Sequence, residues 1–168
     1  MAFNTRYKMF KRYTYNGGIA DPCIISWPKG IKAQGGVRDQ YHHAIDIVPT
    51  VLDLLNVEMP EEVKGYPQTP IQGVSMAYSF DGADVPSERN LQYFEMLGMR
   101  GIYHDGWKAV CPWPGPSFTE AGAFFGIPIP YEKLTELDAT GWELYHVAED
   151  VAENHDVAAE NRDKLIEM

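Results

Sequence analysis

The stretch YKMFKRYTYNGGIADPCIISWP, residues 7–28, joins a basic aromatic segment to a double glycine and an apolar run. The chain carries 14 Lys and Arg against 24 Asp and Glu, a formal charge of -10, yet four basic residues gather before the glycines (Arg6, Lys8, Lys11 and Arg12). The apolar residues from 19 to 27 predict a buried strand that Pro28 ends. The basic segment is either a solvated arm or a device that places a lysine beside an anion.

Length and composition limit the class of protein. A chain of 168 residues fits one domain, or one domain and part of another, and 45% hydrophobic content supports a packed core. The acidic balance argues against nucleic acid as a partner, because such binding needs a broad basic surface. The sequence has no long apolar run and no targeting signal, so we expect a soluble protein with no membrane partner, of unknown compartment. Cys23 and Cys111 are expected to be small core residues.

One helix is strongly indicated in the first half of the chain. In DIVPTVLDLLNV, residues 46–57, Asp46 is placed as an N-cap, Pro49 lies in the first turn and apolar residues follow helical spacing. We expect this helix to be largely buried. The proline-containing segment 58–72 is interpreted as a connector and domain boundary, and residues 73–80 predict a short helix.

The second half of the chain predicts a sheet. Four runs have the character of antiparallel strands, at residues 91–97, 99–104, 107–113 and 142–149. Asp-Gly at 105–106 is a strong hairpin signal between two of them. The Pro- and Gly-rich segment 112–141 predicts a long irregular loop, and residues 156–168 predict a terminal helix. The element order indicates an α+β fold, in which the strand and helix of the first 60 residues have no evident partners.

Candidate chemical groups are few. His42, His43 and Asp46 stand at near-helical spacing, but a metal site needs three or four convergent ligands, so we interpret His43 and Asp46 as the cap and rim of a helix. Ser75 lies in GVSMA rather than in G-x-S-x-G, so no serine nucleophile is predicted. The remaining candidate is a lysine held just before a glycine turn, whose ammonium can hold sulfate or phosphate as a point charge.

Five segments resemble the sulfatase family, in family order and over nearly the whole chain. They are KRYTYNGGIADP with the later WP, HAIDIVPTVLDLLNV, GVSM, YFEMLGMRGIYHDGWKAV and WELYHVAEDVAENHDVAAEN. The first resembles the family's lysine, five residues and Gly-Gly-Ile-x-x-Pro. The last resembles its closing W-x-L-Y-x-L-x-x-D-P-x-E segment. The series as a whole is specific to sulfatases.

The resemblance implies the C-terminal part of an alkaline-phosphatase-like α/β sulfatase fold. Residues 1–58 then supply the terminal strand and helix of the large catalytic domain, and residues 59–168 form a small domain with an antiparallel sheet and a terminal helix. The implied activity is that of an arylsulfatase-type sulfuric ester hydrolase acting on a small sulfated substrate. Its formylglycine nucleophile and calcium ion belong to an upstream catalytic domain, because this chain has no C/S-x-P-x-R motif. We expect no metal ligand here, and no activity from the chain alone.

By position, only Lys11 matches a family active-site residue, with a catalytic and substrate-binding role. It lies six residues before Gly17, whereas Lys8 has the wrong spacing. The family often has Glu-Gly-Gly-Ile-Arg where this chain has Asn16 and Ala20. Two alternatives stay open: a non-catalytic binding or oligomerisation module that self-associates, and a phosphoesterase of the same superfamily.

Overall fold

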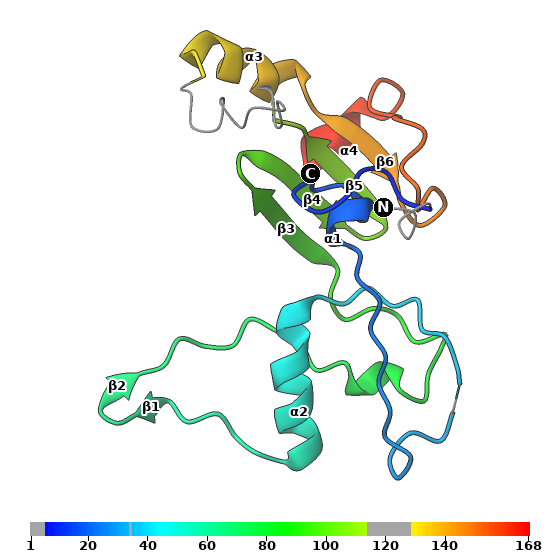
Figure 1. Cartoon of the computed structure of the whole chain (residues 1–168), viewed down its shortest axis with the longest axis vertical. Helices are drawn as coiled ribbons and strands as arrows, with labels where there is room; N and C mark the ends of the chain where they lie inside the picture. The colour runs from blue at the N-terminus through cyan, green and yellow to red at the C-terminus, as the bar shows by residue number, and fades with distance from the viewer. Residues whose placement is uncertain (1–5, 34, 114–128) are drawn as a thin grey trace. The chain divides into compact units, whose positions relative to one another are not determined.

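The computed structural model describes residues 6–33, 35–113 and 129–168, and the chain divides into two compact units (Figure 1). One unit comprises Met1–Pro22 with Leu91–Met168, and the other comprises Cys23–Asn90. The boundary expected at residue 58 concerns the division of a longer protein, and it stays a prediction. None of the helices described has the length and apolar character that crossing a bilayer requires.

The first unit is built on a four-stranded antiparallel sheet. Its strands follow the order β3 (Leu91–Met96), β4 (Met99–His104), β5 (Trp107–Cys111) and β6 (Glu143–His146). The turns Leu97-Gly98 and Asp105-Gly106 join β3 to β4 and β4 to β5, and all four turn residues have positive φ, as a type I′ hairpin requires. The four predicted strands are therefore confirmed.

Both faces of the central strand β5 are covered. Because side chains alternate along a strand, Lys108 and Val110 share one face and Ala109 and Cys111 the other; all four are buried. Val110 packs with two tyrosines, Tyr15 of the N-terminal segment and Tyr145 of β6. The N-terminal segment therefore covers the face of the sheet that carries Lys108.

Among the described residues of the first unit, the sheet is accompanied by three helices: α1 (Asn16–Ile19), α3 (Tyr131–Thr140) and α4 (Arg162–Glu167). The prediction of an irregular loop over 112–141 is wrong for α3, a ten-residue helix that follows Pro130. The prolines and glycines before Pro130 favoured a loop in the sequence pattern. Residues 114–128 of the predicted loop lie outside the described residues. The terminal helix begins later than predicted, because Asp156 instead accepts hydrogen bonds from the Leu144 and Ala158 N–H groups.

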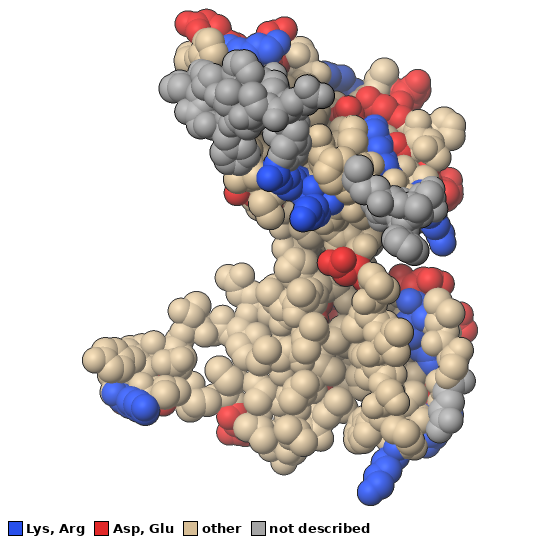
Figure 2. Space-filling model, in the orientation of Figure 1, with Lys and Arg blue, Asp and Glu red and all other residues tan. Residues whose placement is uncertain are grey.

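The second unit contains α2 (Ile47–Leu55), a short hairpin of β1 (Glu62–Val63) and β2 (Tyr66–Pro67), and two 3₁₀ turns at Ala44–Asp46 and Ala77–Ser79. The predicted helix is confirmed, but its expected burial is wrong. Val48, Val51 and Leu55 are 55%, 49% and 66% exposed. Figure 2 shows few charged side chains on the surface over α2.

The predicted strand between residues 19 and 27 does not form in the structure. Ile19 closes α1, and residues 20–27 follow without strand pairing. Ile24 is 93% exposed and Trp27 is 39% exposed. A strand needs a neighbour to satisfy its backbone groups, and the described residues provide none beside this run.

Candidate functional site

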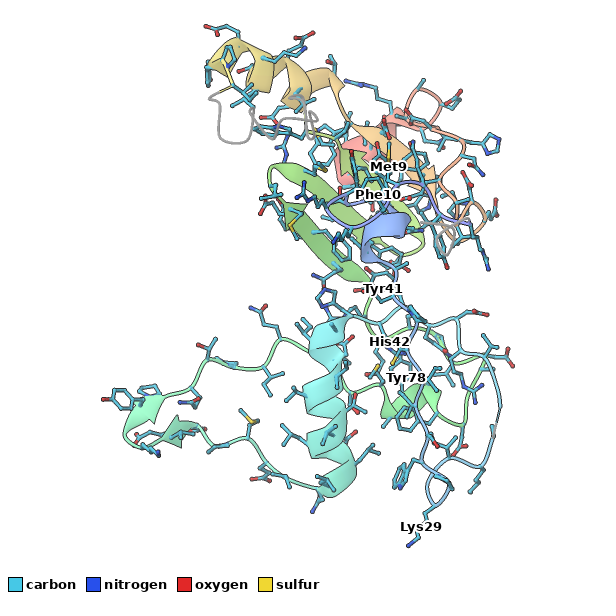
Figure 3. The ribbon with its side chains drawn as sticks, in the orientation of Figure 1. Met9, Phe10, Lys29, Tyr41, His42 and Tyr78 are labelled. Atoms are coloured by element: carbon cyan, nitrogen blue, oxygen red, sulfur yellow. The ribbon has the colours of Figure 1, made fainter. Side chains whose placement is uncertain are left out.

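Lys11 lies at the tip of a closed loop in the first unit. The Gly17 N–H donates to the Lys8 carbonyl at 3.0 Å, which closes the loop at its base. Within it, the Tyr13 N–H donates to the Phe10 carbonyl at 3.1 Å, so Lys11 and Arg12 are the two central residues of a tight turn. Figure 3 shows Phe10 of this turn beside α1. Lys11 is exposed and makes no hydrogen bond or ion pair with the residues that the structure describes.

The second glycine of the pair is required by the turn. A Cβ atom on Gly18 would lie 1.9 Å from the Tyr13 carbonyl oxygen and 2.9 Å from that of Phe10, both of which are backbone atoms. Arg12 has a φ of 89°, and Met9 a φ of 61°. Left-handed backbone at such residues costs about 1–2 kcal/mol each. The loop is therefore a strained structure held by its surroundings.

Lys8, the rival of Lys11, is part of the packing of the unit. Its Nζ donates to the Tyr145 hydroxyl at 2.7 Å and lies 3.5 Å from the Glu143 carboxylate. The same ammonium lies 4.6 Å from the ring centroid of Tyr15 and 4.9 Å from that of Tyr145. These contacts occupy Lys8 within the fold, so only Lys11 presents an exposed ammonium from this loop.

Two phenols share one carboxylate beneath the loop. The hydroxyls of Tyr15 and Tyr145 donate to Oε2 of Glu143 at 2.6 Å and 2.5 Å. Burial raises the pKa of both phenols well above the ordinary tyrosine value, and the hydrogen bond to Glu143 adds to the rise. Both therefore remain neutral donors, which anchors the loop to β6.

A buried ion pair holds the C-terminal side of the loop. Lys108 of β5 donates from Nζ to Oε1 of Glu153 at 2.7 Å and to Oδ1 of Asn16 at 3.0 Å. Oε2 of Glu153 accepts the backbone N–H of Asn16 at 2.6 Å. The Asn16 amide also donates to the Val151 carbonyl at 2.9 Å. Burial lowers the pKa of Lys108 to about 8, although Glu153 acts in the opposite direction.

Sequence reasoning did not find this network. Alternation along Trp107-Lys108-Ala109 indicates a solvent-facing lysine, and the one contrary signal was the apolar Val110 on the same face of the strand. Glu153 gave no comparable signal, because its segment is acidic and irregular. The contacts of both residues span more than 40 positions in the sequence.

The interpretation of His43 and Asp46 as a helix cap is confirmed. Asp46 accepts the His43 N–H at 2.8 Å, and the His43 ring accepts the Ile45 N–H at 3.3 Å. Asp46 is fully buried and pairs with Arg89, at 2.8 Å between Nε and Oδ2. Burial would raise the pKa of this carboxyl, but the hydrogen bonds from Arg89, Val74 and His43 outweigh it and hold the pKa below its usual value.

His42 has a packing role in the same unit. Its ring meets that of Tyr78 edge to face, with the centroids 5.7 Å apart, and Figure 3 shows the two side by side. Burial lowers the pKa of His42, so the neutral ring is favoured. Among the described residues, no three His, Cys, Asp or Glu side chains stand together as a metal site.

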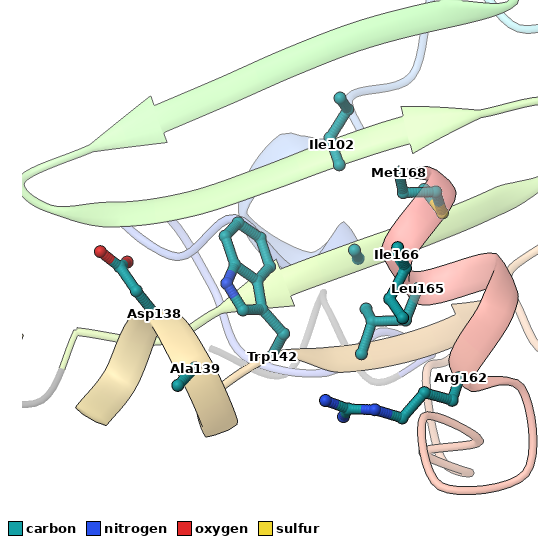
Figure 4. A pocket seen from close by; sticks show the side chains of 9 residues that line it. Ile102, Asp138, Ala139, Trp142, Arg162, Leu165, Ile166 and Met168 are labelled. Carbon is teal, nitrogen blue, oxygen red and sulfur yellow. The ribbon is translucent and has the colours of Figure 1, made fainter. Parts of the chain in front are cut away.

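A cavity of about 320 Å³ lies on the other face of the sheet (Figure 4). Ile102 and Ala109 form its floor, and Trp142, Leu165 and Ile166 are among its walls. Its lining includes none of the residues of the Lys11 loop. The cavity lies between the sheet and α4 and is mostly apolar, so it is a gap in the packing of that layer rather than part of the Lys11 site.

Comparison with known proteins shows a consistent pattern. A family model described as N-sulphoglucosamine sulphohydrolase, C-terminal, matches residues 6–98, more than half of the chain. An uncharacterised sulfatase of Schizosaccharomyces pombe is 26% identical over 166 residues, which is 96% of this chain and 26% of that protein. An N-acetylglucosamine-6-O-sulfatase of Bacteroides thetaiotaomicron is 36% identical over 61 residues, 36% of this chain and 11% of that protein.

Two solved structures share the fold. One, described in work on glycosaminoglycan metabolism by Bacteroides thetaiotaomicron, has a TM-score of 0.66 and 21% identity, covering 97% of this chain and 30% of that one. The other, in complex with its substrate D-glucosamine-2-N,6-O-disulfate, has a TM-score of 0.52 and 22% identity, covering 86% and 26%. The chain thus spans about a quarter to a third of the length of the relatives that it matches over most of its own length.

Proposed function

Because this chain belongs to the N-sulphoglucosamine sulphohydrolase C-terminal family, we propose that it is the C-terminal part of an enzyme that hydrolyses sulfate esters. The α+β fold of a sulfatase C-terminal part, expected from the sequence, is confirmed by the solved structures. The observation that carries the proposal is the Lys11 loop. It lies within the matched segment, and Gly18 is the residue that its backbone geometry requires.

The role proposed for Lys11 is electrostatic. An exposed ammonium on a strained, well-anchored turn can stand against a sulfate oxygen as negative charge develops in the transition state. Groups of this kind contribute roughly 3–4 kcal/mol of transition-state stabilisation when they are held in place. Because Lys11 contacts the sulfate rather than the rest of the substrate, its contribution should be common to aryl and sugar sulfates.

The nucleophile and the metal are proposed to lie elsewhere in the protein. A formylglycine would supply the attack on sulfur, and calcium would polarise the sulfate oxygens, as the resemblance implies. Among the residues that the structure describes, the two fully buried carboxylates form ion pairs, Asp46 with Arg89 and Glu153 with Lys108. These two carboxylates are therefore not proposed as calcium ligands. We expect the chain alone to be inactive.

The remaining part of the protein is also the proposed binding partner of the exposed apolar residues. Residues 1–58 would then complete the catalytic domain, with Ile24 and the outer side of α2 covered by it, while residues 59–168 form the smaller domain. The exposure of Ile24, Val48 and Leu55 supports this arrangement, because such residues are normally buried.

An activity assay tests the proposal. The whole protein should release sulfate from 4-nitrophenyl sulfate or from 6-O-sulfated N-acetylglucosamine, and residues 1–168 alone should not. Turnover by the isolated chain would contradict the division of roles. Hydrolysis of 4-nitrophenyl phosphate with no sulfatase activity would instead favour a phosphoesterase, and the absence of both activities would favour a binding module.

A further inference from the structure

Lys108 and Glu153 form a salt bridge with almost no contact with water. Lys108 is 1% exposed and Glu153 is 0% exposed, with 2.7 Å between Nζ and Oε1. Removing two charges from water is costly, and the attraction between them often does no more than offset that cost. Well-packed apolar side chains could fill the same space. A pair of this kind is therefore weak evidence for a purely stabilising role.

The remaining hydrogen bonds of the pair converge on one residue. Lys108 donates to the Asn16 side chain at 3.0 Å, and Glu153 accepts the Asn16 backbone N–H at 2.6 Å. Both carboxylate oxygens of Glu153 are thus used, one by each partner. Glu153 itself has a φ of 56°, a left-handed backbone that a residue of this type seldom adopts. The fold accepts this strain at the position that aims the carboxylate at Asn16.

Asn16 begins the short helix that supports the Lys11 turn. Gly17, the next residue, closes the loop on Lys8 at 3.0 Å, and Gly18 packs against the carbonyls of Phe10 and Tyr13. A shift of Asn16 would therefore move both the base of the loop and the surface on which the turn rests. Glu153 contacts Asn16, and beyond Asn16 the contacts that connect it to the Lys11 turn are made by backbone atoms.

We propose that Lys108 and Glu153 are positioning residues, whose ion pair fixes Asn16 and thereby sets the direction in which the loop presents Lys11. The expected effect of these residues on kcat rests on the proposed function. Their expected effect on the conformation of the loop formed by residues 8–18 does not. Lys108 and Glu153 do not contact the substrate; each acts through Asn16.

The structural content is tested by hydrogen exchange in the whole protein. Glu153→Gln and Lys108→Met should speed amide exchange in peptides spanning 8–18 on the order of tenfold, because the loop opens locally. Asp46→Asn is the matched control, since it breaks the buried pair with Arg89 in the other unit and contacts none of these residues. Unchanged exchange over 8–18 in both Glu153→Gln and Lys108→Met would overturn the proposal, whether or not the protein proves to be a sulfatase.

The kinetic consequence is tested by a double-mutant cycle with Lys11→Ala. Glu153→Gln alone should lower kcat with a sulfate ester by about tenfold to a hundredfold, with little change in KM. In a Lys11→Ala background the same change should lower kcat by less than about twofold, because its effect passes through Lys11. An equal loss in both backgrounds would show a merely structural role and contradict the proposal.

A conservative variant covers the case in which Glu153→Gln does not fold. Lys108→Arg keeps the charge but changes the length and shape of the donor, so it should fold and still misplace Asn16. The same exchange and kinetic measurements then apply to Lys108→Arg. Unchanged exchange over residues 8–18, or an equal loss of kcat with and without Lys11→Ala, would again contradict the proposal. If the wild-type protein hydrolyses no sulfate ester, the proposed function fails while the exchange measurement still decides the positioning role.

Discussion

At the scale of single residues, two lysines three positions apart have different environments. Lys8 is held by a phenol, a carboxylate and two aromatic rings, whereas Lys11 is exposed at the tip of its turn. A carboxylate close to an ammonium weakens the electrostatic attraction between that ammonium and a further anion. Of these two lysines, Lys11 is the more exposed, and its assignment to the site stays a proposal.

Gly18→Ala should destabilise the first unit through the Lys11 loop. The added methyl group would collide with the Tyr13 carbonyl oxygen, a backbone atom, and relieving that contact should cost about 2 kcal/mol or more. Gly65→Ala is the comparison variant: its Cβ would meet open space, so its cost reports only the strain of a positive φ, which Gly18 does not have. Urea unfolding measures both. A cost for Gly18→Ala no larger than for Gly65→Ala would show that the loop adapts freely.

Lys108 should make stability depend on pH in the alkaline range. Its pKa in the folded protein is about 8, below the ordinary value of 10.5, so the unfolded chain binds more protons between these limits. The free energy of unfolding should therefore rise with pH from about 8 towards 10, by on the order of 1–3 kcal/mol from this group.

The comparison of wild type with Lys108→Met isolates this effect in urea unfolding at pH 8 to 9.5. Tyr15 and Tyr145 have raised pKa values and act in the opposite direction above about pH 10, so the series ends below that point. The variant should lose the rise. Identical slopes for the two proteins would mean that Lys108 is not buried as a charged group.

At the scale of elements, the two hairpin turns of the sheet differ in residue choice. Asp105-Gly106 has the composition that a type I′ turn favours, whereas Leu97-Gly98 places a bulky apolar residue at a φ of 56°. Leu97 is 44% exposed, so little packing offsets the strain. The β3–β4 hairpin is thus less favourable locally than the β4–β5 hairpin.

Leu97→Asn should stabilise the first unit by about 0.5–1 kcal/mol, because asparagine tolerates left-handed backbone far better than leucine. The reciprocal change Asp105→Leu, at the well-formed turn, should destabilise by a similar amount. Thermal unfolding of both variants checks the pair. A stability loss for Leu97→Asn would show that the leucine packs usefully in the whole protein.

The sheet was predictable from sequence because its signals are local. Alternation in each strand and the Asp-Gly turn define the β4–β5 hairpin within a dozen residues. Residues 20–27 have the same apolar character, yet they form no strand, because pairing depends on a neighbour distant in sequence. Helix α3 was not predicted because the Pro- and Gly-rich segment before Tyr131 indicates a loop, and this signal was extended over the residues that follow it.

The candidate site was only partly predictable. The position of Lys11 follows from its spacing to the double glycine, which is a property of one short segment. Its anchors, Glu143 and Glu153, lie more than 120 positions away and sit in segments with no distinctive pattern. Their role depends on the register of β5 and β6, which no local signal specifies.

At the scale of the whole molecule, we expect the exposed apolar residues to determine its association behaviour. Three are prominent in the second unit, namely Ile24, Val51 and Leu55. A surface of this kind usually marks a contact with another protein part. The relatives are three to four times longer than this chain, which makes the remaining part of the same protein the natural candidate.

Residues 1–168 expressed alone should self-associate through these residues. Ile24→Lys combined with Val51→Lys should raise the monomer fraction in sedimentation velocity, because charge opposes burial of either face. Tyr131→Lys is the control, since Tyr131 is 78% exposed and lies in the other unit. A monomeric wild-type chain at high concentration would argue against these residues as an interface.

The most direct test of the central claim is kcat of Lys11→Ala in the whole protein with a sulfate ester. Loss of the ammonium should lower kcat on the order of 10²- to 10³-fold, while the unfolding midpoint stays close to that of the wild type. Lys29→Ala serves as the control, since Lys29 is exposed and points away from the chain (Figure 3). A kcat for Lys11→Ala within about twofold of the Lys29→Ala value would contradict the assignment of Lys11 to the sulfate.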